Sequence, residues 1–276
     1  MDRPLPAPLR HRVTRLVGVI VVAAVFLAPL ALLVSGSLRT PGLPPPGGLE
    51  LLPERARLDN YPTAVHLVPF GRQLLNSLTI IAIAVPVTVL VASWSGYAIV
   101  TAGRRLRWLL IGVSVGVLMV PASALWVPRV VLLESLGMTG HPAAVALPSL
   151  MATSPFYVLL MALAYARVPR SLYEAAAVEG LTPLQTWWRV AWPLGRPAAF
   201  AVGVLAYVFY WSDFVGPLLL LPSERDWPLA LGLRALAELE PAVFPLFLAG
   251  AVLATMPAAL AFALAQRSLF RTTLGE

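Results

Sequence analysis

The sequence predicts an all-α membrane protein with six transmembrane helices. Hydrophobic residues make up 59% of the 276 residues and charged residues 12%, whereas soluble domains have about 45–50% and about 25%. A helix that crosses a hydrocarbon core of about 30 Å needs roughly 20 residues, and six apolar runs are long enough. They cover residues 16–38, 74–101, 108–133, 143–166, 198–221 and 243–265. We therefore expect one membrane domain over residues 16–266, between an N-terminal segment of residues 1–15 and a C-terminal tail of residues 267–276.

The first run could belong to a signal peptide or to a permanent membrane anchor. Arg10, Arg12 and Arg15 precede it, which suits both. Its apolar core from position 16 to 34 is longer than the 7–15 residues of a signal-peptide core. We therefore expect an uncleaved anchor.

The longest loop, residues 39–73, follows this anchor. Its proline-rich segment 41–49 cannot form a helix or a central strand, because proline lacks an amide hydrogen and restricts the backbone. A stiff spacer and a disordered linker both remain open for this segment. Nearer the second run, we expect residues 60–70 to form an amphipathic segment that leads into the membrane.

Prolines occur within several of the apolar runs. In a membrane, the backbone groups that a proline frees must be satisfied by neighbouring helices. We expect six such prolines to kink the helices: Pro29, Pro86, Pro121, Pro128, Pro148 and Pro155.

The positions of the basic residues predict the orientation of the helices. Six crossings place both termini on one side of the membrane, together with the loop after the second run and the polar segment 171–197. With Arg167 and Arg170, which directly precede the polar segment, these parts hold 13 of the 20 basic residues, all of which are Arg. Cytoplasmic loops carry such an excess, so we expect both termini and the polar segment in the cytoplasm. This topology explains the net charge of +7 without a nucleic-acid partner.

The polar segment is expected to form two short helices joined by a sharp turn. Ser171 with Glu174, and Thr182 with Gln185, have the spacing of capping boxes at helix N-termini. Gly180 lies between them, where a helix ends readily in a left-handed backbone conformation. The sequence thus predicts a helix-turn-helix elbow at the membrane surface.

The elbow resembles the EAA loop of ABC-importer permeases, whose pattern is EAA, three residues, Gly, nine residues and Ile-x-Leu-Pro. Glu179 stands where Asp is commoner, and Trp192 stands where Leu is usual. The resemblance implies a coupling helix that docks into a cleft on an ATPase subunit and transmits the closure of that subunit to the membrane helices. The coupling residues that it implies are Glu174, Ala175, Ala176, Gly180 and Pro193.

Three other patches are similar to the carbohydrate-type permeases, of the kind that import maltose or glycerol phosphate. They are Asn60-Tyr61, Asn76-Ser77 and Trp211-Ser212-Asp213-Phe214, where that subfamily usually has Trp-Asn-Asp-Phe. The resemblance covers residues 60–267. It implies a bacterial inner-membrane subunit that works with a second homologous permease, two ATPase subunits and an extracytoplasmic solute-binding protein.

Asp213 is the one acidic residue that we expect within or near the bilayer. A charge at the bilayer centre costs about 2.5–3.5 kcal/mol on insertion scales, so it normally faces a bundle interior or a water-filled cavity. With Tyr210 and Trp211 it could line a sugar pathway, where aromatic faces and polar tips suit a hydroxylated ligand. Alternatively, Asp213 pairs with an Arg or with backbone groups and fixes helix packing, which is the role that we favour.

The chain is not expected to be an enzyme or to hold a cofactor or metal. A P-loop needs a Lys to reach the phosphates, and the sequence contains none. The expected topology separates His11, His66 and His141, which argues against a metal cage or a Ser-His-Asp site. Energy must therefore come from a partner.

These observations predict the permease subunit of an ATP-driven importer of a carbohydrate or carbohydrate-like solute, working by alternating access. An importer of a non-sugar solute stays open, because the chain carries no substrate-specific signature. An ion-coupled carrier is disfavoured by the scarcity of intramembrane charges and by the lack of broken helices in matching halves. A membrane scaffold without transport activity is the remaining alternative.

Overall fold

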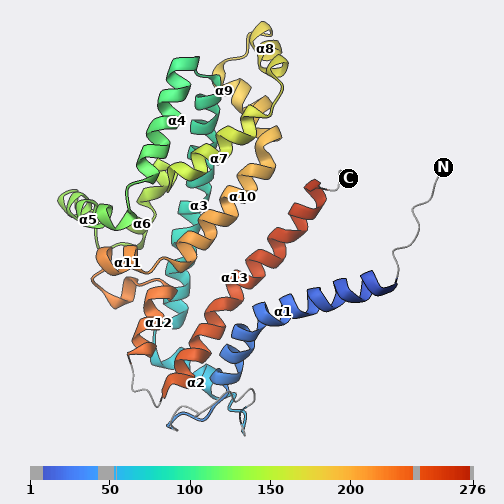
Figure 1. The fold of residues 1–276 in the computed structure, drawn as a ribbon. Helices are drawn as coiled ribbons and strands as arrows, with labels where there is room; N and C mark the ends of the chain where they lie inside the picture. Colours follow the sequence, from blue (N-terminus) through green and yellow to red (C-terminus); the bar gives the residue numbers. More distant parts are fainter. Residues whose placement is uncertain (1–8, 43–52, 54, 239–242, 274–276) are drawn as a thin grey trace. The chain divides into compact units, whose positions relative to one another are not determined.

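The computed structural model describes residues 9–42, 53, 55–238 and 243–273, and the regular elements within these residues are all helices (Figure 1). This confirms the all-α fold class that the composition predicts. The described chain forms two compact units, one from residues 1–68 and 235–255 and the other from residues 69–234 and 256–276.

The first unit begins with α1, Leu9–Ser37, which covers the first apolar run and starts before it. The short helix α2 follows at Asn60–Leu67, within the expected amphipathic segment. The buried Asn60 side chain donates from Nδ2 to the carbonyl oxygens of Ser37 and Arg39, both at 2.7 Å. The last carbonyls of a helix have no partner within it, so Asn60 fixes the end of α1.

Tyr61 contributes to the same junction, because its hydroxyl lies 2.8 Å from Ser37 Oγ. The Asn60-Tyr61 patch therefore has a structural role in joining α2 to α1. The proline-rich segment 41–49 lies outside the described residues from position 43 onward, and both readings of it stay predictions.

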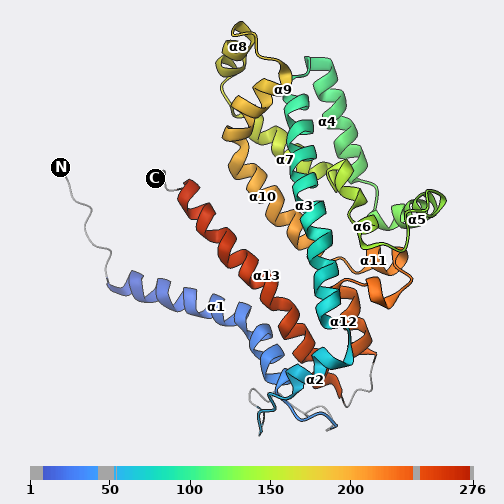
Figure 2. The same ribbon diagram turned by 180° about the vertical axis from the view of Figure 1, so that it is seen from behind.

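The second unit is built around α3, Phe70–Thr101, which packs against α7, Pro155–Ala166, and α10, Trp192–Ser212 (Figure 1 and Figure 2). All three helices contribute buried side chains to one apolar core, including Ala92, Met161, Ala199 and Val202.

Helices α3 and α7 approach closely at Gly96. A Cβ atom there would lie 2.7 Å from the backbone nitrogen of Ala162 and 2.9 Å from the carbonyl carbon of Met161. These are backbone atoms, so they cannot move aside like the end of a flexible side chain. The crossing therefore requires a residue without a side chain.

Four described helices are long and apolar enough to cross a membrane, namely Arg15–Ser37, Phe70–Thr101, Pro183–Ser212 and Phe244–Ala263. Two further candidates are bent pairs, Arg104–Leu118 with Ala122–Ser135 at 92° and Pro142–Met151 with Pro155–Ala166 at 43°. The described part of the chain thus offers four to six crossings by length and composition, and six stays a prediction.

The third and fourth apolar runs are divided into shorter helices than the sequence suggests. The third contains α4, Arg104–Leu118, then a 3₁₀ turn, Ala122–Leu125, and α5, Trp126–Ser135. The fourth contains α6, Pro142–Val145, then a 3₁₀ turn, Leu147–Met151, and α7. Helix breaks are therefore present, in two consecutive runs.

Most of the six prolines expected to kink helices lie instead at helix breaks or near helix starts. Only Pro29 and Pro86 of the six lie inside helices, as expected. The first turn of a helix does not need the amide hydrogen that proline lacks. Pro121 lies in the break with the 92° bend, and Pro155 directly follows the break with the 43° bend. The expected kinks are wrong for Pro128 and Pro148, because both lie near the starts of their helices.

The fifth run also differs from the single helix expected at 198–221. Helix α10 ends at Ser212, and a separate helix, α11, follows at Val215–Leu220. Beyond it lie a 3₁₀ turn at Glu224–Asp226 and α12, Leu229–Ala237. The last helix, α13, runs over Phe244–Thr273 and has Pro257 inside it.

Candidate functional site

The first helix of the elbow is α8, Arg170–Val178 (Figure 1). Gly180 lies just beyond its C-terminal cap, where the sequence predicts the turn. Gly180 has a φ of 73°, in the left-handed region. Its amide donates to the Ala177 carbonyl at 3.0 Å, and the Leu181 amide donates to the Ala176 carbonyl at 3.0 Å. These two bonds form a Schellman motif, which fixes the direction in which the chain leaves α8.

The second half of the elbow starts with the predicted capping box. The Thr182 amide donates to Gln185 Oε1 at 2.9 Å, and the Gln185 amide donates to Thr182 Oγ1 at 3.3 Å. These bonds begin the short helix α9, Pro183–Thr186. The chain direction is thus fixed on both sides of the turn.

The other predicted capping box, Ser171 with Glu174, is wrong. Pro169 stands at the N-cap position of α8 without a side-chain cap. Its φ of −54° suits the start of a helix, so α8 begins at the next residue. Ser171 is then already inside the first turn. Glu174 is left free of the structural role that the capping box would have given it.

One face of α8 is exposed and includes two small side chains, Ser171 and Ala175. Ser171, Glu174, Ala175 and Val178 lie at helical spacings of three and four and are all exposed, Val178 at 89%. Ala176 instead turns inward and is only 4% exposed. A partner could therefore approach the backbone closely along this face, where Glu174 is the charged group.

A π turn, Trp187–Ala191, connects α9 to α10. The Trp192 amide donates to the Trp187 carbonyl five residues earlier. Pro193 comes directly after; it has no amide hydrogen, and its ring would collide with the carbonyl four residues before it in an ordinary helix. The wider turn avoids that collision. As a result, Pro183–Ser212 runs as one 30-residue helix, and the elbow leads directly into α10.

The three residues proposed for a substrate pathway lie at the other end of α10. Tyr210 is 4% exposed, and its hydroxyl lies 2.8 Å from Thr153 Oγ1, which lies 2.6 Å from Thr88 Oγ1. Trp211 is half-buried and stacks on Tyr207, with ring centroids 5.7 Å apart. The hydroxyl chain therefore holds the end of α10 against α3 and the break before α7.

Asp213 connects α10 to α11. Its Oδ1 accepts a hydrogen bond from the Gly216 amide at 3.1 Å. A Cβ atom on Gly216 would lie only 2.4 Å from Asp213 Oδ2, so the carboxylate fills the space above the first turn of α11. This contact with a backbone group is the kind that a packing role requires.

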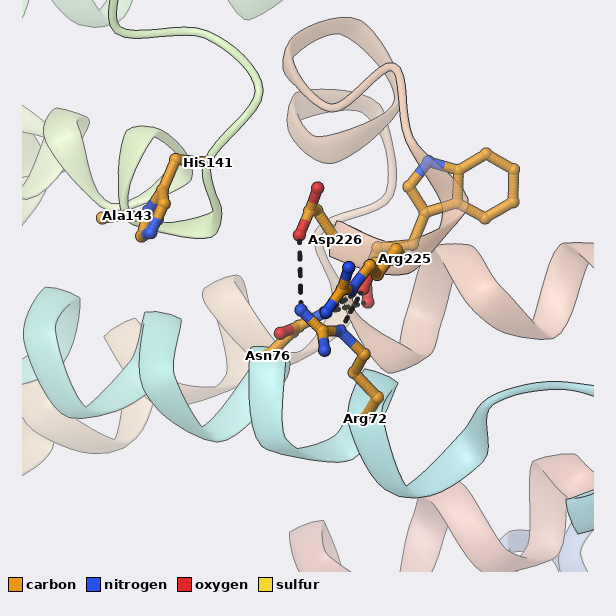
Figure 3. Close-up of polar contacts among 7 residues, drawn as sticks. Arg72, Asn76, His141, Ala143, Arg225 and Asp226 are labelled. Carbon is orange, nitrogen blue, oxygen red and sulfur yellow. Dashed lines mark hydrogen bonds and ion pairs between the residues drawn. The ribbon is translucent and has the colours of Figure 1, made fainter.

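The patch Asn76-Ser77 anchors the chain between α11 and α12, which the sequence did not indicate; Figure 3 shows Asn76 beside Arg72 and Arg225. Asn76 Nδ2 donates to the carbonyls of Arg225 and Trp227 at 3.0 Å each. Arg72 Nε donates to the same Arg225 carbonyl at 2.9 Å. Ser77 Oγ accepts from the amide that starts α12, at 2.8 Å.

The same region shows how His141 is used. Its Nδ1 accepts from the Ala143 amide at 3.1 Å and caps the start of α6 (Figure 3). Among the residues that the structure describes, no three His, Cys, Asp or Glu side chains gather where a metal ion could bind.

Comparisons with known proteins place these features in a family. The family described as "Binding-protein-dependent transport system inner membrane component" matches residues 88–273. The lactose transport system permease protein LacG of Rhizobium radiobacter is 28% identical over 221 residues, which cover 80% of each chain. The arabinooligosaccharides transport system permease protein AraQ of Halalkalibacterium halodurans is 27% identical over 261 residues, covering 91% of this chain and 90% of AraQ.

The fold has a counterpart among solved structures. It matches the crystal structure of a bacterial ABC transporter involved in the import of the acidic polysaccharide alginate, with a TM-score of 0.71 and 19% identity. The match covers 96% of this chain and 99% of the other. With two thirds of its length matched by one family, the chain belongs to the inner-membrane components of binding-protein-dependent transport systems.

Proposed function

We propose that this chain is the permease subunit of an ATP-driven importer that moves a carbohydrate or carbohydrate-like solute by alternating access. The observation that carries the proposal is the family match, together with similar permeases of lactose and arabinooligosaccharide transport systems. The subunit does not hydrolyse ATP itself, since the chain has no Lys for a P-loop.

The elbow would supply the coupling to the ATPase. The exposed small face of α8, with Glu174 and Ala175, offers a surface that a cleft on the partner can enclose. The Schellman turn at Gly180 sets the angle of that face. Because the second half of the elbow continues into α10 through the π turn, a displacement of the elbow would reach a membrane helix at that turn.

The proposed assembly contains this permease, a second homologous permease, two ATPase subunits and an extracytoplasmic solute-binding protein. The chain would cross the bacterial inner membrane six times, with both termini and the elbow in the cytoplasm. The placement of 13 of 20 Arg residues on that side supports this orientation.

The end of α10 is the proposed contact with the solute. The stacked rings of Tyr207 and Trp211 form a flat apolar surface of the kind that suits a sugar ring. Tyr210 and Asp213 would hold this surface in place, through the hydroxyl chain and the bond to α11.

The test is uptake by the complete complex reconstituted into proteoliposomes. The chain is purified with its partner permease, ATPase and binding protein, and radiolabelled lactose, an arabinooligosaccharide and an α-glucoside are offered with ATP on the ATPase side. We expect uptake of one of these sugars that depends on both the binding protein and ATP. Uptake of none of them, with ATP-dependent import of an amino acid or a peptide instead, would contradict the carbohydrate class.

A further inference from the structure

A buried polar contact joins the elbow to two membrane helices. Trp187 Nε1, at the start of the π turn, donates to Ser93 Oγ on α3 at 2.9 Å. The same oxygen lies 2.5 Å from the Tyr165 hydroxyl on α7. Ser93 and Tyr165 are fully buried and Trp187 is 8% exposed. One serine hydroxyl therefore connects three elements in a place without access to water.

The hydrogen-bonding chemistry of this contact is restrictive. An indole N–H can only donate, so Ser93 Oγ must accept from Trp187 and use its remaining capacity for Tyr165. A buried donor or acceptor that loses its partner is destabilised, because no water replaces the lost bond. The elbow therefore cannot turn away from α3 and α7 unless this contact breaks or the two helices move with it.

The first half of the elbow reaches the same tyrosine. Tyr173, on α8, has its hydroxyl 3.4 Å from the Tyr165 carbonyl. Tyr97, on α3, packs against both Tyr165 and Tyr173, with ring centroids 6.4 and 6.1 Å apart. Burial, and to a smaller extent Tyr97 and Tyr165, raise the pKa of Tyr173 to about 12, so its hydroxyl keeps its proton at neutral pH. Both halves of the elbow thus contact Tyr165.

The Tyr165 ring has no free space in which to move. A Cβ atom on Gly195 of α10 would lie 2.5 Å from Tyr165 Cε1 and 3.0 Å from its hydroxyl oxygen. The ring lies between Tyr97 of α3 and Gly195 in the first turn of α10, and Tyr165 is fully buried.

The π turn explains why such a contact is needed. An ordinary helix passes on a displacement because its hydrogen-bond ladder is continuous. Here the ladder widens at Trp187–Ala191 and lacks the amide of Pro193, so this point is where the helix bends most easily. The contact lies at the start of the turn and Gly195 lies just beyond it. Together they bridge the weak point.

We infer that Ser93, Tyr165 and Trp187 form a polar clamp that makes the elbow, α3 and α7 move together when the ATPase pulls on the elbow. The inference rests on the proposed function, and in it the three residues position the elbow, α3 and α7 relative to one another. None of the three contacts ATP or the solute in this role. Without the polar clamp, the π turn would absorb the displacement and ATP would be hydrolysed without transport.

The test uses the assembled complex in proteoliposomes and the panel sugar that the wild type imports. Trp187→Phe removes the indole N–H but keeps an aromatic ring, and Ser93→Ala removes the hydroxyl. Both should keep membrane abundance, ATPase co-purification and ATP hydrolysis within about twofold of wild type, while sugar imported per ATP hydrolysed falls at least about fivefold. Ser93→Thr keeps the hydroxyl and should restore most of the ratio.

Trp188→Phe is the matched control. Trp188 is the next residue and is 56% exposed, and the indole that donates to Ser93 is that of Trp187. The Trp188 ring packs on Trp187 and Trp192, and phenylalanine keeps an aromatic ring there, so this variant should match wild type. The double variant W187F/S93A should lose no more than the worse single variant, because either change already opens the polar clamp.

Three outcomes would overturn the inference. An unchanged ratio of sugar to ATP in both single variants would do so, and so would losses that multiply in the double variant. Loss of membrane abundance in both would make the cluster a folding core only. If the wild-type complex shows no ATP-dependent uptake, the proposed function fails together with the inference. If the wild-type complex imports sugar normally and W187F and S93A behave as wild type, only the polar clamp is disproved.

Discussion

At the scale of single residues, Gly180 carries the clearest functional demand. Its φ of 73° is left-handed, and a Cβ atom there would meet nothing within 4 Å. The restriction is therefore on the backbone and not on space. Because the two Schellman bonds depend on that backbone angle, the orientation of α8 depends on Gly180.

Gly180→Val should uncouple the complex without unfolding the permease. A β-branched residue in the left-handed region costs about 1–2 kcal/mol, which is a small loss for a protein with several membrane-embedded helices. Gly137 has a φ of 65° and equally open surroundings outside the elbow, so Gly137→Val is the matched control. Membrane abundance, ATPase co-purification and uptake are compared for both.

For this pair, we expect normal abundance in both variants and loss of ATPase attachment or uptake in G180V alone. If G180V matches wild type in all three measurements, the elbow is an ordinary loop and the coupling proposal is wrong.

Asp213 is the second residue with a decisive substitution. If its role is to hold α11, Asp213→Asn keeps an oxygen for the Gly216 amide and should leave stability and uptake near wild type. Asp213→Ala removes that oxygen and should destabilise the protein by about 1–3 kcal/mol, the usual range for a lost charged or buried acceptor. Thermal melting in detergent and the uptake KM are measured. A stable D213N with a much higher KM would place Asp213 in the solute pathway instead.

At the scale of elements, the spacing of residues in the sequence predicted the helix ends and turns that are formed by residues close together in the chain. The Gly180 turn and the Thr182–Gln185 capping box follow from such spacing, and the structure has both. The Ser171 capping box failed, because Pro169 began the helix earlier than the Ser–Glu spacing suggested. Hydropathy found the apolar runs but not the 92° bend between α4 and the helices after it, since apolar residues fill a bent span as well as a straight one.

The π turn and the polar clamp could not be predicted from the sequence. Trp187 and Trp188 are adjacent and identical, yet one is buried against Ser93 and the other is exposed. Which of them turns inward depends on the register that Pro193 imposes and on how α3 and α7 pack. Both are tertiary effects that a single sequence does not display.

The crossing of α3 and α7 gives a prediction at this scale. Gly96→Ala should lower membrane abundance and destabilise the protein by about 1–3 kcal/mol, because the new methyl group would collide with the α7 backbone. Gly112 lies on α4 with nothing within 4 Å of an added Cβ, so Gly112→Ala is the control and should behave as wild type. Equal abundance of the two variants would show that the crossing is looser than the geometry indicates.

At the scale of the whole molecule, the orientation follows from where the Arg residues lie. A reporter fused after Glu276 should be active in the cytoplasm, and Gly47→Cys, in the long loop after the first run, should react with a membrane-impermeant reagent from outside. Residue 47 lies outside the described part of the structure, so this prediction rests on the Arg distribution. Labelling of Gly47→Cys only after the membrane is permeabilised would reverse the assignment.

The source of energy separates an importer subunit from an ion-coupled carrier. An importer subunit without its own P-loop must take energy from a partner ATPase, whereas an ion-coupled carrier would take it from a gradient. Sugar uptake by the complete complex is therefore measured with an ATPase partner made inactive by mutation, and separately with a protonophore while ATP is maintained. We expect uptake to disappear with the inactive ATPase and to survive the protonophore; uptake that persists with the inactive ATPase and follows the proton gradient would contradict the account.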